Sequence, residues 1–455
     1  MLSADLDVRK AYAKDVSGLE LIPEFVARPT TVEEVAELLK QSSRDRTAVT
    51  PAGLQSSTTA ASITDQGTLL SLRSLAHIDE VDTASLSIRA GAGAIVADVR
   101  RAAEAKGLLF TPDPTSEEES TIGGAIACNA SGARSLRYGA TRPHVKSLTV
   151  LLANGEKLEL KRPQLEKNTV GYPITHDPVD WFIGSEGTLG VVTEAVFQLQ
   201  PLPNQVLGLV VPFEKESDAL AFVVSARQSR AVHPRCLEYF DHGAMDIARA
   251  AEGSSNWATS ANAMVYVEET GVDNSDAELP LDEWLALAEQ HNAQSDSIRV
   301  YDSPASQLEA RKMRHAVPST MNERGAACRP FGGRKVSTDW AVPYPRLAEA
   351  LTIARNFAKD ANIPLGIAYG HAGNGHPHQN FVAQDADELK RIEQVVYATL
   401  KEVIAMGGTV AAEHGIGKLK RRWLPLQASD AQLRVMRALK HELDPLGILA
   451  PGNVL

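Results

Sequence analysis

Three histidines lie close together in the segment AYGHAGNGHPHQNF (368–381). Within it, Asn374-Gly375 is the dipeptide preferred in two-residue β-hairpin turns. With that turn, His371 and His378 are paired across neighbouring strands, and their Cβ atoms are about 5 Å apart. Two imidazoles at this separation can share one metal ion. His376 is two residues before His378 and therefore lies on the same face of the predicted strand, so it remains a competing ligand.

A second segment, GGTVAAEHGIGKLKRR (407–422), places Glu413 beside His414 on a glycine-flanked loop. A carboxylate there can supply a third metal ligand, and the adjacent imidazole can act as a general base. Two histidines and one carboxylate leave coordination positions open, which is typical of a catalytic rather than a structural site. Zinc, manganese and ferrous iron are all compatible with these donors.

Histidines beside glycines often do no more than hydrogen-bond within a loop. One such histidine would indicate little. Four histidines and a glutamate in two glycine-framed segments make a metal site a real alternative to that simpler interpretation.

The composition excludes several classes of protein. The chain has 455 residues, 44% hydrophobic and 23% charged, with a net charge of −11 and no basic run. Nucleic acid is therefore not an expected partner. The three cysteines, Cys128, Cys236 and Cys328, are far apart, which disfavours disulfides and an internal iron–sulfur cluster. No apolar leader or membrane-spanning run occurs, and we expect a cytoplasmic protein.

Alternating helix and strand patterns predict the secondary structure of the first part of the chain. Thr31 to Glu34 reads as a capping box that opens an amphipathic helix, and residues 47–50 read as a short strand. The loop 51–62 follows, then a strand at 86–90 and a helix from Val96 to Lys106 that Gly107 stops. This alternation predicts a layered sheet covered by helices.

The segment 111–142 is rich in small residues and can let the backbone approach a ligand closely, and 184–203 is a second such loop that enters a strand. Between them, the apolar strands at 147–160 flank Asn154-Gly155 and predict a hairpin. From about 205 to 420 the pattern changes to long helices separated by strands, which predicts a separate α+β domain. The expected helices are Ser217–Gln228, Leu281–Gln290, Tyr344–Ala361 and Ala386–Met406.

Taken together, the chain resembles the FAD-linked oxidases of the vanillyl-alcohol-oxidase superfamily, in the branch of D-2-hydroxy-acid dehydrogenases and glycolate oxidase. The resemblance runs over almost the whole chain, through DPTSEEESTIGGAIACNASGARSLRYG, DWFIGSEGTLGVVTEA, YGHAGNGHPHQN, AAEHGIGKLKRRWL and LDPLGILAPG. It implies an α+β protein with a two-subdomain FAD-binding domain (1–203), an α+β cap domain that carries the substrate and metal site (204–420), and a C-terminal segment (421–455) that returns to the FAD domain.

The resemblance also implies where FAD binds. The pyrophosphate would lie on the loop 51–62, which keeps one glycine of the family's usual run. No His or Cys lies in this loop as an obvious covalent anchor, so FAD is expected to be non-covalent. Ala450 stands where the family commonly has Asn. The implied cofactor residues are Gly53, Leu54, Gln55, Ser56, Ser57, Asp113, Thr115, Gly123, Gly124, Asn129, Gly132, Tyr138, Gly139 and Glu186.

For the metal, the resemblance implies the ligands His371, His378 and Glu413 and makes His376 a weaker candidate. His414 would be the catalytic base. Arg314 resembles the arginine that holds the substrate carboxylate in this family. Weaker substrate candidates are Arg311, Lys335 and Asn380.

The implied activity is oxidation of a D-2-hydroxy acid, such as D-lactate or D-2-hydroxyglutarate, to the 2-oxo acid by hydride transfer to flavin. A quinone, a cytochrome or an electron-transfer flavoprotein would accept the electrons. A homodimer and a peripheral position beside a membrane acceptor are compatible with this. The alternatives are a flavin subunit of a glycolate-oxidase-like complex, a transferase like alkylglycerone phosphate synthase, and a flavin-free metallohydrolase.

Overall fold

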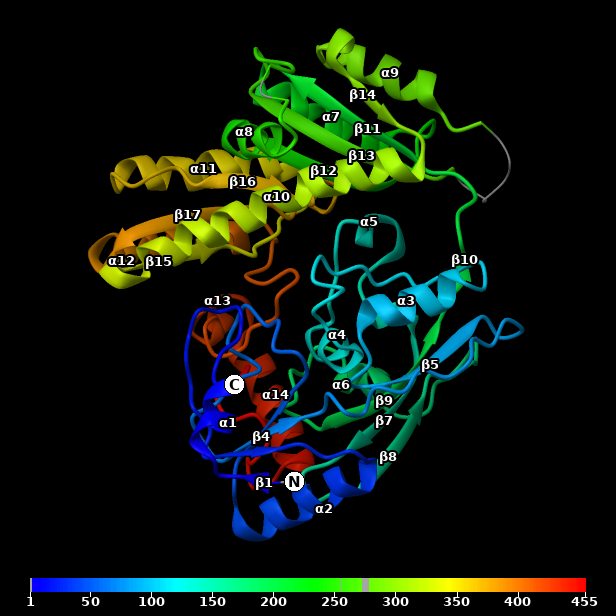
Figure 1. Ribbon diagram of the computed structural model, residues 1–455, viewed down its shortest axis with the longest axis vertical. Helices are drawn as coiled ribbons and strands as arrows, with labels where there is room; N and C mark the ends of the chain where they lie inside the picture. The colour runs from blue at the N-terminus through cyan, green and yellow to red at the C-terminus, as the bar shows by residue number, and fades with distance from the viewer. Residues whose placement is uncertain (1, 255, 272–277) are drawn as a thin grey trace. The chain divides into compact units, whose positions relative to one another are not determined.

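A computed structural model describes residues 2–254, 256–271 and 278–455. The chain forms two compact units (Figure 1). Unit 1 contains residues 1–132, 139–202 and 413–455, and unit 2 contains residues 133–138 and 203–412. This division differs from the predicted ranges at residues 133–138 and 203, which belong to unit 2, and at residues 413–420, which belong to unit 1.

Unit 1 is built on two four-stranded sheets and one two-stranded sheet. The first has the order β1-β2-β4-β3, in which β2, β4 and β3 are parallel: β1 (Leu2–Ser3), β2 (Phe25–Ala27), β4 (Thr68–Ser71) and β3 (Val49–Ala52). The second has the antiparallel order β5 (Ser87–Gly91), β9 (Val191–Gln198), β7 (Val145–Leu151) and β8 (Lys157–Lys161). The short pair is β10 (Gln200–Pro201) and β6 (Leu108–Leu109).

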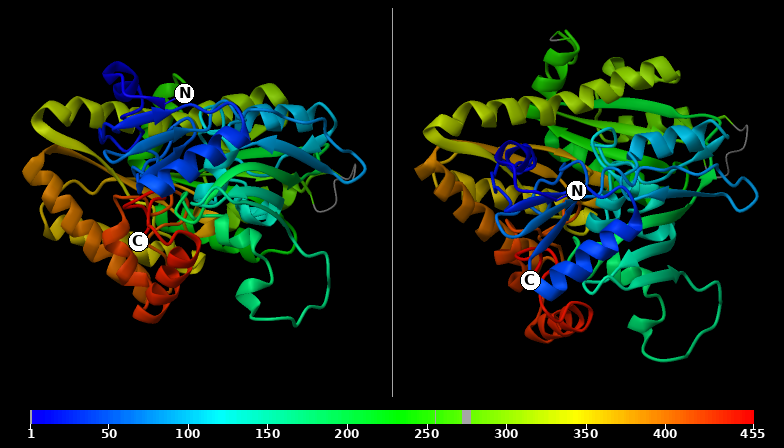
Figure 2. Two further views of the ribbon diagram at one scale, coloured as in Figure 1. Left: turned by 90° about the horizontal axis from the view of Figure 1, so that it is seen from below. Right: turned by 60° about the horizontal axis from the view of Figure 1, so that its bottom comes forward.

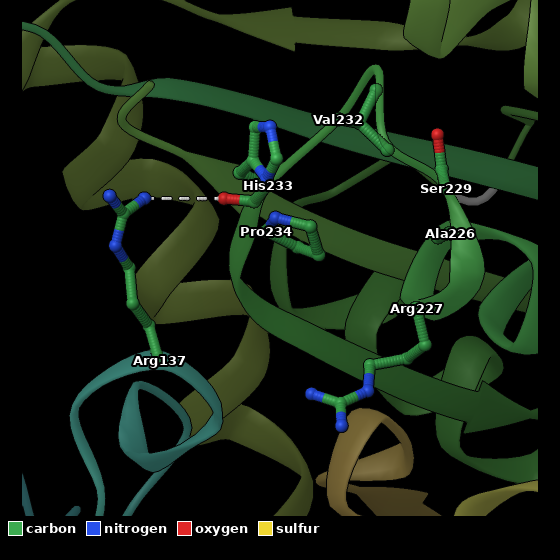
Figure 3. Close-up of a pocket in the computed structure, with 7 residues that line it drawn as sticks. All are labelled: Arg137, Ala226, Arg227, Ser229, Val232, His233 and Pro234. Carbon is green, nitrogen blue, oxygen red and sulfur yellow. Dashed lines mark hydrogen bonds between the residues drawn. The ribbon is translucent and has the colours of Figure 1, made fainter. Parts of the chain in front are cut away.

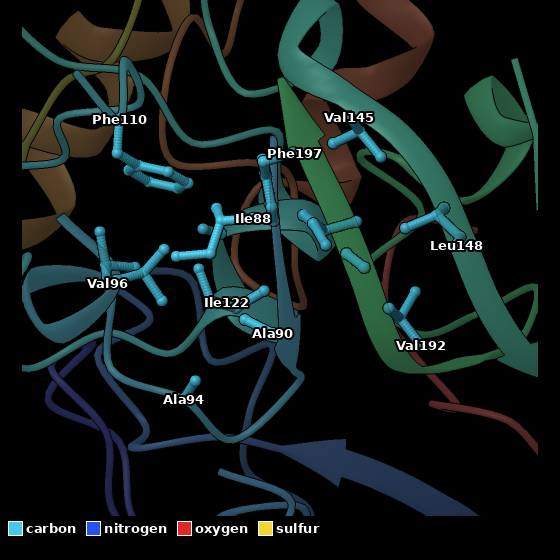
Figure 4. Packing of buried hydrophobic residues seen from close by; sticks show 14 of the residues in the cluster. Ile88, Ala90, Ala94, Val96, Phe110, Ile122, Val145, Leu148, Val192 and Phe197 are labelled. Carbon is cyan, nitrogen blue, oxygen red and sulfur yellow. The ribbon is translucent and has the colours of Figure 1, made fainter. Parts of the chain in front are cut away.

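The helices of unit 1 are α1 (Leu6–Ala11), α2 (Val32–Asp45), α3 (Val96–Glu104), α4 (Ile122–Cys128), α6 (Val179–Phe182), α13 (Leu424–Gln427) and α14 (Asp430–Leu443). Single 3-10 turns occur at η1 (Arg142–His144), η2 (Pro173–Thr175) and η7 (Arg421–Trp423). A core of apolar side chains from β5, β7, β9, α3 and α4 fills the space around Ile88, Phe110 and Phe197 (Figure 4). The long connection between β8 and α6 projects away from its sheet (Figure 2).

Unit 2 is a seven-stranded antiparallel sheet covered on both faces by helices. Its order is β14 (Arg299–Tyr301), β11 (Leu207–Phe213), β13 (Ala263–Glu269), β12 (Pro234–Asp241), β16 (Ile367–Gly370), β17 (His378–Asp385) and β15 (Gly332–Ser337). In one helical layer, α8 (His242–Ala251) packs against α10 (Pro304–Cys328). Another layer contains α7 (Glu216–Gln228), α9 (Leu281–Gln290), α11 (Leu347–Asp360) and α12 (Ala386–Ala405).

The remaining short elements of unit 2 are α5 (Ser135–Tyr138) and the 3-10 turns η3 (Ser295–Ser297), η4 (Arg329–Phe331), η5 (Tyr344–Arg346) and η6 (Ala372–Asn374). The predicted α+β architecture is confirmed, and the four helices predicted for unit 2 (α7, α9, α11 and α12) begin and end within a few residues of their predicted limits. The 25-residue helix α10 was not among the predicted helices. Within the part of the chain that the structure describes, no helix is both long and apolar enough to cross a membrane.

Two local predictions in unit 1 need correction. Thr31 caps α2 by accepting from Glu34 N, but the Glu34 carboxylate accepts from Thr30 N and not from Thr31, so the capping box is not closed. β7 and β8 do form the predicted hairpin. Its loop has three residues (153–155) rather than two, because Leu152 N still bonds Glu156 O at 2.9 Å. Gly155 then adopts a left-handed φ of 78°.

The C-terminal segment forms part of unit 1. Leu449 pairs with Val49 of β3 in parallel, through Val49 N to Ile448 O and Ala450 N to Val49 O, both at 2.8 Å. The end of the chain therefore extends the sheet that carries the loop 51–62.

Candidate metal and flavin sites

Three imidazoles meet at the junction of β16 and β17 in unit 2. The ring centroids are 5.2 Å apart for His371 and His378, 5.3 Å for His371 and His376, and 4.6 Å for His376 and His378. One ring nitrogen from each lies within 4.8 Å of those of the other two. His371 and His376 are buried, whereas His378 is partly exposed. The arrangement can hold one cation that a ligand reaches from the side of His378.

The predicted hairpin register is wrong. His378 pairs with Tyr369 and not with His371, so the loop is longer than two residues and contains the turn η6. A tertiary contact sets this loop, because Val342 N donates to Gly375 O at 3.0 Å and a Cβ on Gly375 would lie 1.9 Å from Val342 O. The two histidines still meet, since His371 leaves the strand immediately after Gly370 and turns back toward the start of β17.

Glu238, which the sequence analysis did not identify, holds His371 in place. It lies on β12 among apolar neighbours and is almost fully buried. Its Oε1 is 2.6 Å from His371 Nδ1, and its Oε2 accepts from Arg314 Nε at 2.6 Å. Burial alone would raise the pKa of Glu238, but the charge of Arg314 and the imidazole of His371 lower it to about 2. A carboxylate that accepts from Nδ1 fixes the ring and leaves Nε2 for a metal.

Asp339 is a second residue that sequence reasoning missed. It is buried just after β15, and its Oδ1 is 3.2 Å from His376 Nε2. It also offers an oxygen within 4.8 Å of a ring nitrogen of His378. Each of these residues is the one acid in a largely apolar stretch: Glu238 in Leu237-Glu-Tyr-Phe240 and Asp339 in Thr338-Asp-Trp-Ala341. Such an acid could have been identified from the sequence as a candidate, since a buried charge requires a partner.

Glu413 and His414 follow directly on unit 2. Ala412, the last residue of that unit, donates from its backbone N to Asp339 O at 2.8 Å. Glu413 is joined to Ala412 by a peptide bond. The loop that starts there is held within unit 1 by Glu186, whose carboxylate accepts from Ile416 N at 2.6 Å and from Gly417 N at 2.7 Å.

Glu186 was predicted as a flavin contact, and that role stays a prediction. Burial raises the pKa of its carboxyl group, and the two backbone N–H groups lower it in part. The structural role that we find for it is to fix the turn after His414.

The predicted substrate residues lie on or under the sheet of unit 2. Asn380, two residues after His378, donates to Tyr369 OH at 2.8 Å, and its buried Oδ1 has no hydrogen-bond partner among the described residues. Lys335 lies on the neighbouring strand and donates to Asn322 Oδ1 at 2.7 Å, and burial lowers its pKa to about 8. Both can approach a polar ligand beside His378.

Arg311 belongs to a different group of charges. The charge of Arg134 lowers its pKa, and burial adds to this effect. Arg134 and Arg235 both donate through Nε to Oε2 of the buried Glu268, at 2.9 Å and 2.7 Å. Arg311 therefore lies near this ionic cluster, and its role toward substrate stays a prediction.

The predicted pyrophosphate loop, residues 51–62, has the features of an anion site. The structure gives the backbone N–H groups of residues 54–58 no acceptor among the residues that it describes. Gln55 and Ala60 have left-handed backbones, with φ of 62° and 61°. Turns of this kind aim successive N–H groups at one point, where an anion can bind. The side chain of Gln55 is used internally, because its Nε2 donates to Tyr12 O at 2.8 Å.

The other predicted cofactor residues of unit 1 converge on α4. Gly53 is needed for this approach, since a Cβ there would lie 2.2 Å from Oγ1 of Thr121, the N-cap of α4. A Cβ on Gly132 would lie 2.1 Å from Asp113 O, so the chain passes closely there too. Gly123 and Gly124 are in the first turn of α4, and Asn129 caps its end. Thr115 is exposed and Gly139 follows in the next loop, whereas Tyr138 belongs to unit 2.

A separate pocket of about 320 Å³ lies between α5 and the connection from α7 to β12 (Figure 3). Arg137, which lines it, donates to His233 O at 3.3 Å and to Thr270 Oγ1 at 2.9 Å. Arg227 lies 4.8 Å from the centre of the Tyr344 ring. This pocket contains none of the predicted site residues, and we assign it no role in the reaction.

Two protein families match parts of this chain. Residues 23–161 match the family described as FAD binding domain, and residues 202–454 match the family described as FAD linked oxidases, C-terminal domain. The chain is 31% identical to glycolate oxidase subunit GlcD of Bacillus subtilis, covering 98% of this chain and 92% of that protein. It is 29% identical to a D-lactate dehydrogenase of Anaerostipes hadrus, covering 95% and 89% of the two chains.

A solved structure of alkyldihydroxyacetonephosphate synthase has the same fold, with a TM-score of 0.72 and 19% identity over 99% of this chain and 83% of that one. The FAD-binding match covers the loop 51–62 and the residues around α4, and the second match covers the histidine cluster and the segment with Glu413 and His414. The chain therefore belongs to the FAD-linked oxidases.

Proposed function

We propose that this protein is an FAD- and metal-dependent dehydrogenase that oxidises a D-2-hydroxy acid to the 2-oxo acid. The observation that carries the proposal is the cluster of three imidazoles within 4.8 Å of one another, in a chain that also has the FAD-binding match. Relatives named D-lactate dehydrogenase and D-2-hydroxyglutarate dehydrogenase, each 29% identical to the chain, support the substrate class.

The donor set fits a divalent cation of borderline softness. We propose His371, His378 and Glu413 as the ligands. His376, which is paired with Asp339, would support the cluster from one side. A cation held there by these residues would supply Lewis-acid chemistry that lowers the pKa of a substrate hydroxyl.

Side chains of the protein would orient the ligands, bind the substrate and remove the proton. Glu238 keeps the His371 ring oriented, and Arg314, held by Glu238, would pair with the substrate carboxylate. Asn380 and Lys335 would contact the rest of the substrate. His414 would remove the hydroxyl proton as general base.

The proposed cofactor is dissociable FAD. The loop 51–62 fits its diphosphate, because its backbone N–H groups at 54–58, which have no acceptor among the described residues, can donate to a dianionic group. When bound, FAD supplies a two-electron acceptor for the hydride from C2. The hydroxy acid thus loses one proton and one hydride to become the 2-oxo acid, and a separate acceptor reoxidises the flavin.

The proposal is tested by steady-state oxidation of a panel of 2-hydroxy acids of both hands with an artificial electron-accepting dye. We expect one or more D acids to reduce the dye and to yield an equal amount of 2-oxo acid. Prior treatment with a chelator should remove the activity, and added zinc, manganese or iron should restore it. If every hydroxy acid in the panel is inert with all three metals, the proposal is wrong.

A second candidate is that the chain acts as the flavin subunit of a larger complex. The match to a protein named as a glycolate oxidase subunit favours it. Because the cysteines here are isolated, iron–sulfur clusters would have to come from a partner. Purification of the tagged chain from its own cells would recover that partner at a fixed ratio if this candidate is right.

A further inference from the structure

Lys418 is a cation that the proposed reaction does not use. It follows Gly417 in unit 1, and its ammonium group donates to Asn453 Oδ1 at 2.7 Å and to Ala60 O at 3.3 Å. Both partners are neutral. No carboxylate among the described residues lies within ion-pair distance of its Nζ, and Asp15, Glu186 and Asp65 act on it only from further away. Burial lowers the pKa of Lys418 to about 8, which leaves it largely charged at neutral pH.

Lys418 is fixed at one end of the loop 51–62. Its backbone N donates to Thr59 O at 3.0 Å, and Leu419 N donates to the same oxygen at 3.2 Å. Gly417 makes this approach possible, since a Cβ there would lie 2.3 Å from Thr59 O. The ammonium group is therefore anchored to the last residues of the loop whose N–H groups at 54–58 have no acceptor among the described residues.

A second cation at this loop, Arg73, has a different role. Arg73 donates from Nε to Gly53 O and from Nη2 to Gln55 Oε1, both at 3.0 Å. Its guanidinium group also lies 4.9 Å from the centre of the Tyr12 ring. Arg73 thus binds oxygen atoms of the loop itself and holds its shape.

Among the residues that the structure describes, the ammonium group of Lys418 has only neutral partners, and the N–H groups of residues 54–58 have no acceptor. Both features favour a bound anion, and they adjoin at the loop 51–62. We propose that Lys418 is a cofactor-binding residue whose ammonium group pairs with the diphosphate of FAD on the loop 51–62. The loop contains one glycine, Gly53, so it lacks the conformational freedom with which a glycine-rich backbone surrounds a phosphate closely. The lysine charge compensates for this. The inference concerns cofactor binding and does not depend on the metal or on the hydroxy acid.

The test measures FAD affinity by dilution of the full-length holoprotein, using the fluorescence of released flavin over a range of salt concentrations. We expect Lys418→Met and Lys418→Gln to weaken FAD binding about 10- to 100-fold, as for loss of one charge-assisted hydrogen bond, and to flatten its salt dependence. Glutamine keeps a donor toward Asn453 and Ala60 without the charge. Lys418→Arg, which keeps the charge, should remain within about threefold of the unaltered protein.

The matched control is Lys14→Met. Lys14 lies beside the same loop, because its carbonyl oxygen is 3.2 Å from Gln55 Nε2, but its exposed ammonium pairs with Glu20 at 3.1 Å. This variant removes one positive charge and should bind FAD normally. Displacement of FAD by ADP and by adenosine gives a second readout, since only ADP carries the diphosphate. We expect the preference for ADP to fall in the two neutral Lys418 variants.

Two results would overturn the inference. One is unchanged FAD affinity in Lys418→Gln. The other is weaker FAD binding with an unchanged preference for ADP over adenosine, which would make Lys418 a structural residue only. If Lys418→Met does not fold, the contrast between the glutamine and arginine variants decides the question.

Discussion

Replacing His371 with alanine is expected to lower the rate of flavin reduction by a 2-hydroxy acid by about 10³-fold, the loss expected when several kcal/mol of metal-assisted stabilisation disappear. FAD should remain bound. His371 is buried in unit 2, and the FAD-binding match at 23–161 lies in unit 1 except for residues 133–138. The measurement is stopped-flow mixing of the oxidised holoprotein with substrate, followed at the flavin absorbance.

Two further variants sharpen this test. His242→Ala removes an exposed imidazole from α8 of the same unit and should leave the rate unchanged. His376→Ala compares the two possible ligand sets, and we expect a smaller loss than for His371 because His376 is already paired with Asp339. Flavin reduction at the normal rate in His371→Ala would contradict the assignment of this residue as a ligand.

Replacing Glu238 with glutamine is expected to weaken metal binding by about 10- to 100-fold. It should also destabilise unit 2 by about 3–5 kcal/mol, because the partly buried Arg314 loses its counter-charge and His371 loses a fixed orientation. Metal affinity is measured by competition with a chromogenic chelator, and stability by the melting temperature of the holoprotein.

Glu216→Gln serves as the control for Glu238→Gln. Glu216 pairs with Arg355 at 2.6 Å in the same unit, but its side chain is 31% exposed and it does not contact a histidine. We expect a smaller loss of stability and no change in metal affinity. Equal metal affinity in Glu238→Gln and the unaltered protein would show that Glu238 does not position His371.

Local patterns predicted several long helices of unit 2, but they did not predict the bounds of the helix α10 that carries Arg314 or of the strands β12 and β15 that carry Glu238 and Lys335. The helix Leu281–Gln290 has the predicted limits, and the helix that begins at Ala386 ends one residue before its predicted end. Strong periodicity and clear end signals explain this success. The hairpin around His371 and His378 shows the limit of such reasoning, because its turn depends on a contact with Val342 that no local pattern contains.

The residues that sequence reasoning missed share a physical cause. Glu238 and Asp339 contact histidines that are far away in the chain, and no local pattern links either acid to its partner. Their burial reveals them only when the partner is known, since a buried carboxylate must be paired. Glu186 is similar, because its partners are the N–H groups of a loop more than two hundred residues later.

The most direct test of the account is anaerobic flavin reduction in holoprotein from which metal has been removed by a chelator. On addition of the D acid found to be the best substrate, we expect the flavin to stay oxidised. Adding a stoichiometric amount of the restoring metal should then bleach it, while the L acid should leave it oxidised in both states. Equally fast bleaching before and after metal addition would contradict a metal-dependent site at His371, His378 and Glu413.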